Sequence, residues 1–166
     1  MKTITKLLFI ALLGLTVSTA YAQNSKADKK AKQEQAVKAQ VDSTKYRFVA
    51  QWMNPLGGRQ VFLTPANYYD IKIRKDSVIA YLPYFGRVYM NAPVGGEDGG
   101  IKFTSTKFDY KVTSKKDRWQ ITINFKDTRK ARRLTMDVFK NGSATANIIS
   151  DNRDPVYFQG NIDIKI

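Results

Sequence analysis

From Tyr46 onward, apolar and polar residues alternate along most of the chain, and this period of two restricts the fold more than any other feature of the sequence. In the stretch 119–125, every second residue is large and apolar, whereas the residues between them are glutamine, threonine and asparagine. Comparable runs lie at 46–52, 71–74, 108–112, 133–138 and 161–166. Such alternation is typical of β-strands that bury one face and expose the other to water.

Short polar breaks separate these runs and indicate antiparallel pairing. Asn141-Gly142 is the strongest hairpin signal, because both residues tolerate a positive φ. Other breaks, at 75–76, 114–117 and 126–130, are too short for a helical crossover. We count roughly eight to ten strands, which must close or stack to hide their faces and edges. The sequence therefore predicts an all-β, antiparallel, closed or nearly closed barrel of the lipocalin-like kind, with a two-sheet sandwich as the alternative.

The first 22 residues predict a cleavable secretory signal. Lys2 and Lys6 precede an apolar stretch at 7–17, and the small residues Ala20 and Ala22 follow at the positions that a signal peptidase reads. The apolar stretch is shorter than the roughly 20 residues that a membrane-spanning helix needs. We therefore expect cleavage near Ala22 and a periplasmic or secreted mature protein without a transmembrane segment.

Residues 23–45 separate this signal from the predicted β-domain at 46–166. The segment is rich in alanine, lysine and glutamine, which favour a helix. Its apolar residues are few, so a helix here has little to bury. We expect a frayed helix or a flexible tether.

The sequence contains no cysteine and no histidine, which removes the thiol nucleophile, the usual general base and the commonest zinc ligands. The formal net charge is +14, and it falls to +12 without Lys2 and Lys6 of the signal. A protein this basic is attracted to anionic surfaces. We predict a non-enzymatic protein without a cofactor or a metal site, and no nucleic-acid partner, because export removes the protein from cytoplasmic nucleic acid.

The segment 82–103 departs from simple alternation. Pro83 ends the strand before it, and large apolar residues then stand where a turn is normally polar. Four glycines surround Glu97 and Asp98 and give the loop easy access to positive φ. Three interpretations compete: aromatics at the mouth of a cavity under a glycine lid, a calcium site at the two carboxylates, or a long hairpin connection whose aromatics pack in the core or at its rim.

Three stretches resemble a family of small bacterial exported proteins. They are Leu-Pro-Tyr-Phe-Gly-Arg-Val-Tyr at 82–89, Gly-Gly-Ile-Lys-Phe at 99–103 and Ser-Asp-Asn-Arg-Asp-Pro-Val-Tyr-Phe-Gln-Gly at 150–160. The family is that of domain of unknown function 4251, and the resemblance implies no assigned activity and no catalytic residues. Many members carry a lipoprotein cysteine after the signal, which this sequence lacks. In the last stretch, we expect Arg153 to pair with a carboxylate and lock the corner of the barrel.

The expected function is binding of a small apolar or amphipathic ligand, such as one with an anionic group. The predicted ligand-binding residues are Tyr81, Tyr84, Phe85, Arg87, Tyr89 and Met90. Their apolar side chains would form the wall of the site, and Arg87 would supply the counter-charge.

The alternative is an interaction module with a filled core, which docks through a basic outer face to a partner protein or to the anionic envelope surface. The basic run at 129–133 is a candidate patch, or else an edge that its charge keeps unpaired: Arg129, Lys130, Arg132 and Arg133. The barrel interior distinguishes the two functions. An empty volume of several hundred Å³ favours ligand binding, whereas a solid core favours docking.

Overall fold

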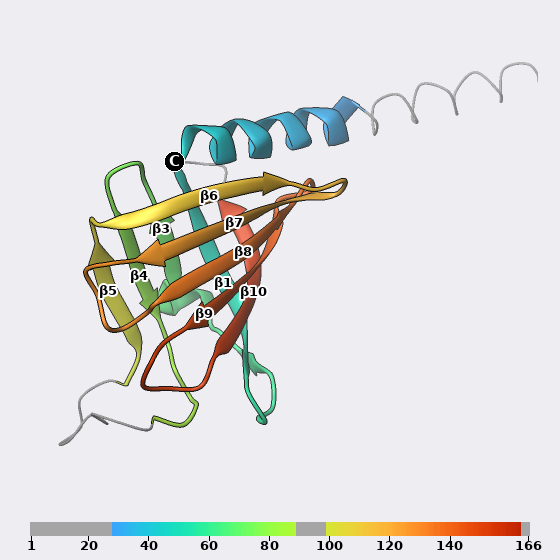
Figure 1. The fold of residues 1–166 in the computed structure, drawn as a ribbon. Helices are drawn as coiled ribbons and strands as arrows, with labels where there is room; N and C mark the ends of the chain where they lie inside the picture. The colour runs from blue at the N-terminus through green and yellow to red at the C-terminus, as the bar shows by residue number, and fades with distance from the viewer. Residues whose placement is uncertain (1–27, 89–98, 164–166) are drawn as a thin grey trace, which may run out of the picture.

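The computed structural model of the protein describes residues 28–88 and 99–163, which form one α-helix, one 3-10 turn and ten strands (Figure 1). The helix spans 28–43. The other elements are β1 (Tyr46–Pro55), β2 (Val61–Phe62), η1 (Pro65–Asn67), β3 (Asp70–Ile73), β4 (Val78–Leu82), β5 (Ile101–Ser105), β6 (Phe108–Ser114), β7 (Arg118–Phe125), β8 (Arg133–Phe139), β9 (Ser143–Ile149) and β10 (Val156–Asp163).

Nine strands form one antiparallel sheet in the order β5-β4-β3-β1-β10-β9-β8-β7-β6, and β2 pairs with β1 outside this path. The two edge strands, β5 and β6, follow each other in the chain and are joined by Thr106 and Lys107. The sheet curls so that β6 and β7 cross over β3 and β4 (Figure 1). The result is a nearly closed barrel, which confirms the predicted fold class.

The interior follows the predicted alternation where the strands are regular. In β7, β8 and β9, every second side chain is buried, from Trp119 to Phe125 on the first of these strands. The loop at Asn141 and Gly142 joins β8 to β9, and Gly142 has a φ of +83°. A positive φ costs a glycine little, which explains the residue at this turn. The alternating face thus builds one continuous apolar core.

Two positions depart from the alternation. Trp52 was expected on the buried face with Phe48 and Ala50, but the register shifts between Ala50 and Trp52, and Met53 is buried instead. A β-bulge of this kind adds one residue to a strand, so the side chains after it point to the opposite face of the sheet from the one that strict alternation predicts. Val112, near the end of the edge strand β6, is exposed, and Phe108 and Tyr110 on the same face are only half-buried.

The helix is docked on the barrel. Val37 and Val41 are buried and belong to the same apolar core as the strands. At the β8–β9 turn, Gln33 donates a hydrogen bond of 2.7 Å to the carbonyl oxygen of Asn141, and Glu34 pairs with Lys140 at 2.7 Å. The helical part of the expected tether is therefore packed against the domain over 28–43.

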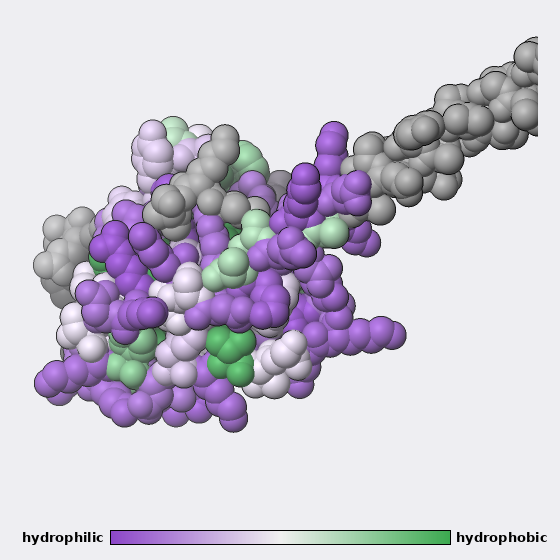
Figure 2. Space-filling model, turned by 90° about the horizontal axis from the view of Figure 1, so that it is seen from above, coloured by the Kyte–Doolittle hydropathy of each residue, from purple (hydrophilic) through white to green (hydrophobic). Residues whose placement is uncertain are grey.

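The end of the molecule that carries the helix is covered mainly by hydrophilic residues, with small separate apolar patches (Figure 2). Over residues 28–88 and 99–163, no helix combines the length and the apolar character that a bilayer span requires. The predicted signal at 1–22 and the loop carboxylates Glu97 and Asp98 lie outside the described residues.

Candidate functional site

The predicted ligand-binding residues separate into two places. Tyr81 lies on β4 and points away from the core: its ring stacks on Tyr69 with centroids 5.6 Å apart, and Lys102 Nζ lies 4.6 Å from the ring centre. Tyr84, Phe85 and Arg87 follow the end of β4. Tyr89 and Met90 lie outside the described residues.

Tyr84 is a structural anchor of this second place. Its hydroxyl lies 2.7 Å from the carbonyl oxygen of Arg87 and 3.2 Å from that of Asp154. The guanidinium of Arg153 lies over its ring at 4.8 Å, and Arg153 Nη1 donates to the carbonyl oxygen of Gly99 at 2.9 Å. Arg153 is buried, and it contacts a carbonyl group and an aromatic face, where a carboxylate was expected.

Phe85 and Arg87 line an open groove with a volume of about 550 Å³. Its wall is completed by Pro55, Leu56, Gly57, Gly58, Gly86 and Asp154. Phe85 and Leu56 are 62% and 63% exposed, so the groove offers two apolar side chains and one cation. The sequence interpretation placed Phe85 and Arg87 at the mouth of a cavity, and in the structure both line this open groove.

Large side chains occupy the barrel interior. The largest that are fully buried include Tyr46, Phe48, Met53, Met136 and Phe158. The hydroxyl groups of Tyr46 and Tyr110 lie 3.0 Å apart, and burial raises the pKa of both. Three cavities lined by described residues all open on the outer surface.

One of these cavities, which we call the basic cleft, has a volume of about 210 Å³. It lies where β1 begins, β3 ends and β10 ends. Four of its lining residues are cations, beside Tyr46, Ile73 and Asp163: Lys45, Arg47, Lys72 and Arg74. The antiparallel register sets Arg47 opposite Lys72 on one neighbour and opposite Asp163 on the other, which explains how charges distant in sequence meet here.

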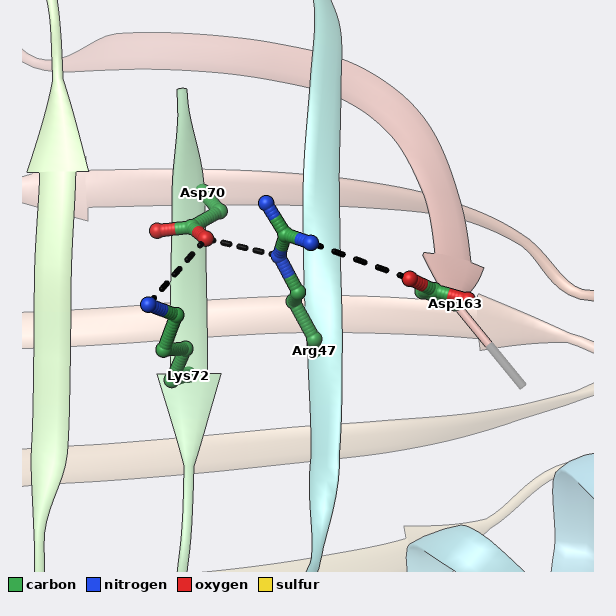
Figure 3. Close-up of polar contacts among 4 residues, drawn as sticks. All are labelled: Arg47, Asp70, Lys72 and Asp163. Atoms are coloured by element: carbon green, nitrogen blue, oxygen red, sulfur yellow. Dashed lines mark hydrogen bonds and ion pairs between the residues drawn. The ribbon is translucent and has the colours of Figure 1, made fainter. Parts of the chain in front are cut away.

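Arg47 is the centre of an ion-pair network (Figure 3). Its Nε lies 2.6 Å from Oδ2 of Asp70, and its Nη1 lies 3.8 Å from Oδ2 of Asp163. Lys72 Nζ is also 3.8 Å from Asp70, whose side chain is only 5% exposed. Within 28–88 and 99–163, no carboxylate forms an ion pair with Lys45 or Arg74. Two of the four cations therefore keep their charge available to an anion.

The basic run at 129–133 lies at the end of the β7–β8 loop and reaches the first residue of β8, and it is partly neutralised. Ala131 is buried, Arg132 Nε lies 3.2 Å from Asp151, and Arg133 donates to the side-chain oxygen of Asn124 at 2.9 Å. All four cations of the run are exposed, and one of them, Arg132, is paired with a carboxylate, whereas the basic cleft combines charge with a concave shape.

Sequence reasoning missed the basic cleft. The alternation assigned Arg47, Lys72 and Arg74 only to the solvent-facing positions of predicted strands. The sequence does contain solvent-facing cations on the runs that form β1 and β3. Whether these cations meet depends on the pairing of the two strands. Pairing partners of a sheet cannot be read from one strand alone.

Comparisons with known proteins give a family and a fold. The sequence model of the family described as "Domain of unknown function (DUF4251)" matches residues 28–162. A crystal structure of a DUF4251 family protein from Bacteroides eggerthii is similar to this chain with a TM-score of 0.58 and 14% sequence identity, and the match covers 78% of this chain and 86% of the other. No curated protein matches the sequence.

Proposed function

Because this chain belongs to the DUF4251 family, whose description assigns no activity, we propose a function from its own geometry: a non-enzymatic module of the bacterial envelope that docks through the basic cleft to phosphate groups of an anionic surface. The sequence supports a non-enzymatic role, because it lacks histidine and cysteine. The formal net charge of +14 supports attraction to an anionic surface.

The observation that carries this proposal is the convergence of four cations on one cleft. Guanidinium and ammonium groups donate charge-assisted hydrogen bonds to phosphate oxygens. Lys45 and Arg74 would bind the phosphate, whereas Arg47 and Lys72 are held by the buried Asp70 and shape the cleft.

Vesicle binding tests the proposal. We expect the protein to co-sediment with vesicles of phosphatidylcholine and phosphatidylglycerol and not with phosphatidylcholine alone. Since each basic residue near an anionic membrane contributes about 1 kcal/mol, the double variant Lys45→Gln/Arg74→Gln should bind about 30-fold more weakly. The matched control is Lys115→Gln/Lys116→Gln, which removes the same charge from the exposed β6–β7 turn.

The comparison of these variants decides the role of the cleft. Equal weakening by both pairs would mean that only overall charge matters, which contradicts the proposal. Competition by millimolar inorganic phosphate would indicate that the phosphate itself is recognised. Binding to an acidic peptide in place of the vesicles would assign the cleft to a protein partner and would also contradict it.

The open groove beside Phe85 supports a second candidate function, binding of a small amphipathic ligand. Leu56 and Phe85 offer apolar contact and Arg87 offers a charge, which is the combination that a fatty-acid anion needs. Dodecanoate should raise the thermal midpoint of the protein and not that of Phe85→Ala/Arg87→Gln. An unchanged midpoint with dodecanoate, together with no small molecule in native mass spectra, would contradict this candidate.

A further inference from the structure

A second groove lies on the outer face of β1, β10 and β9, apart from the basic cleft, and has a volume of about 340 Å³. Two aromatic residues belong to its wall, Trp52 on β1 and Phe139 at the end of β8. The other lining residues are Gln51, Ser143, Ala144, Thr145, Gln159, Gly160 and Asn161. None of the nine is charged, although the chain has a net charge of +14.

The β-bulge creates the aromatic wall. The shift in register between Ala50 and Trp52 turns Gln51 and Trp52 outward in succession. Gly160 on β10 makes this possible, because a methyl group there would overlap the carbonyl oxygen of Val49. Bulges often re-aim a side chain at a functional surface.

The ring of Trp52 is held in place and still reaches solvent. Phe62 on β2 contacts it edge to face, with centroids 4.8 Å apart and planes at 63°. The residue remains 37% exposed. A supported, partly exposed indole is a rigid contact surface that loses little conformational entropy on binding.

The polar residues of the groove stand in cross-strand rows. Trp52 is opposite Gln159, and Gln159 is opposite Thr145 on the next strand. Asn161 is opposite Ser143 in the neighbouring row. Amide and hydroxyl groups both donate and accept hydrogen bonds, so these rows offer mixed, uncharged partners beside the indole.

We propose that this groove binds a neutral oligosaccharide. A sugar ring presents an apolar face of C–H groups that can pack on Trp52 and hydroxyl groups that pair with amides. An anion would find no cation among the lining residues. An apolar ligand would strip water from the amides of Gln51 and Asn161 and from the amide nitrogen of Gln159, whose oxygen already accepts a hydrogen bond of 3.5 Å from Gln60. The inference is independent of the phosphate-docking function, since the two sites share no lining residue.

Fluorescence titration with neutral hexasaccharides tests the proposal. The probes are maltohexaose, cellohexaose, laminarihexaose and xylohexaose. The protein has two tryptophans, and Trp119 is buried at 7% exposure, so a ligand in the groove changes the emission of Trp52. We expect at least one probe to give a saturable change that Trp52→Phe abolishes.

Two variants separate this site from general surface binding. Trp52→Ala should weaken binding of the responding sugar at least tenfold, measured by calorimetry, since buried aromatic contacts dominate such interfaces. Gln159→Leu, which keeps the size of the side chain, should weaken it as well. The matched control is Tyr81→Ala, because Tyr81 is an outer-face aromatic with a similar exposure of 40%, and it should bind as the parent does.

Specific results would overturn the proposal. These are no response to any of the four sugars, equal loss with Trp52→Ala and Tyr81→Ala, or a response to neutral peptides of similar length and not to sugars. Circular dichroism of each variant confirms that the fold is kept. Vesicle binding by Trp52→Ala should equal that of the parent, which keeps this test separate from that of the basic cleft.

Discussion

Arg47 and Asp70 form an ion pair whose carboxylate is almost completely buried. Removing one partner of a buried pair leaves an uncompensated charge, which costs about 3 kcal/mol or more. We therefore expect Arg47→Met to lower the free energy of unfolding by about 3 kcal/mol, measured by urea denaturation. The remaining cation, Lys72, is 3.8 Å from Asp70 and compensates only in part.

A surface pair provides the control for this prediction. Lys38 and Asp42 lie one helical turn apart and both are more than half exposed. Exposed pairs contribute about 0.5 kcal/mol, so Lys38→Met should have little effect. The double variant Arg47→Met/Asp70→Leu should recover much of the loss, and a double variant as unstable as Arg47→Met would contradict the interpretation.

Asp127 holds the turn that joins the two edge strands. Its carboxylate accepts hydrogen bonds from the Ser105 hydroxyl at 2.5 Å and from the backbone N–H groups of Thr106 and Lys107 at 2.8 and 3.0 Å. These hydrogen bonds lower the pKa of Asp127 from 3.8 to about 2, and the bond from Ser105 contributes most. The lowered pKa means that the ionised form stabilises the fold above about pH 4 and that this stabilisation is lost as the pH falls to about 2.

Asp127→Asn should therefore melt at a lower temperature than the parent at pH 7. The difference should narrow between about pH 4 and pH 2, because the parent then loses its carboxylate as well. Calorimetric scans across this range measure the effect. A constant difference at all pH values would mean that the ionised form has no special role. Asp76→Asn, in the β3–β4 turn, serves as the control.

At the scale of elements, the helix at 28–43 shows a limit of pattern analysis. Its two buried valines, Val37 and Val41, are four residues apart and form a stripe too thin to predict burial. The stripe suffices because the barrel supplies the rest of the contact. The hydropathy pattern of a helix shows which of its own residues are apolar. It does not show whether another part of the fold offers an apolar surface on which they can pack.

Substitution of these valines tests the docking of the helix. Val37→Ala and Val41→Ala should each lower the free energy of unfolding by about 2 kcal/mol, because each removes buried methyl groups. Alanine has the higher helix propensity, so a free tether would be unaffected or slightly more helical. Chemical denaturation of the two variants and of Lys32→Ala, which is exposed, distinguishes these cases.

The strands show what sequence can and cannot predict. The alternation from Trp119 to Phe125 and the turn at Gly142 were predictable, because both depend on local geometry. The outward position of Trp52 was not, since the bulge depends on Gly160, which lies opposite only after β1 pairs with β10. The basic cleft and the groove beside Trp52 both arise from such pairings, so their residues are ordinary in sequence and form a site only in the folded sheet.

At the scale of the whole molecule, the charge is strongly one-sided: 28 basic residues oppose 14 acidic ones. The charged groups lie mainly on the outer surface, and the core cluster is apolar. Excess charge of one sign repels itself and destabilises the compact state. The ion pairs around Arg47 act in the opposite direction, but they are local and few.

Salt should therefore stabilise this protein. The Debye length falls from about 30 Å at 0.01 M salt to about 10 Å at 0.1 M. At about 0.1 M, salt therefore screens the repulsion between distant charges of a small domain. Ion pairs in direct contact are much closer than this length and are weakened far less. We expect the thermal midpoint to rise by several degrees over this range of sodium chloride. The rise should be smaller for Lys115→Gln/Lys116→Gln, because its net charge is lower by two. A midpoint that falls with salt would mean that attractive pairs, and above all the network around Arg47, outweigh the repulsion of the whole surface.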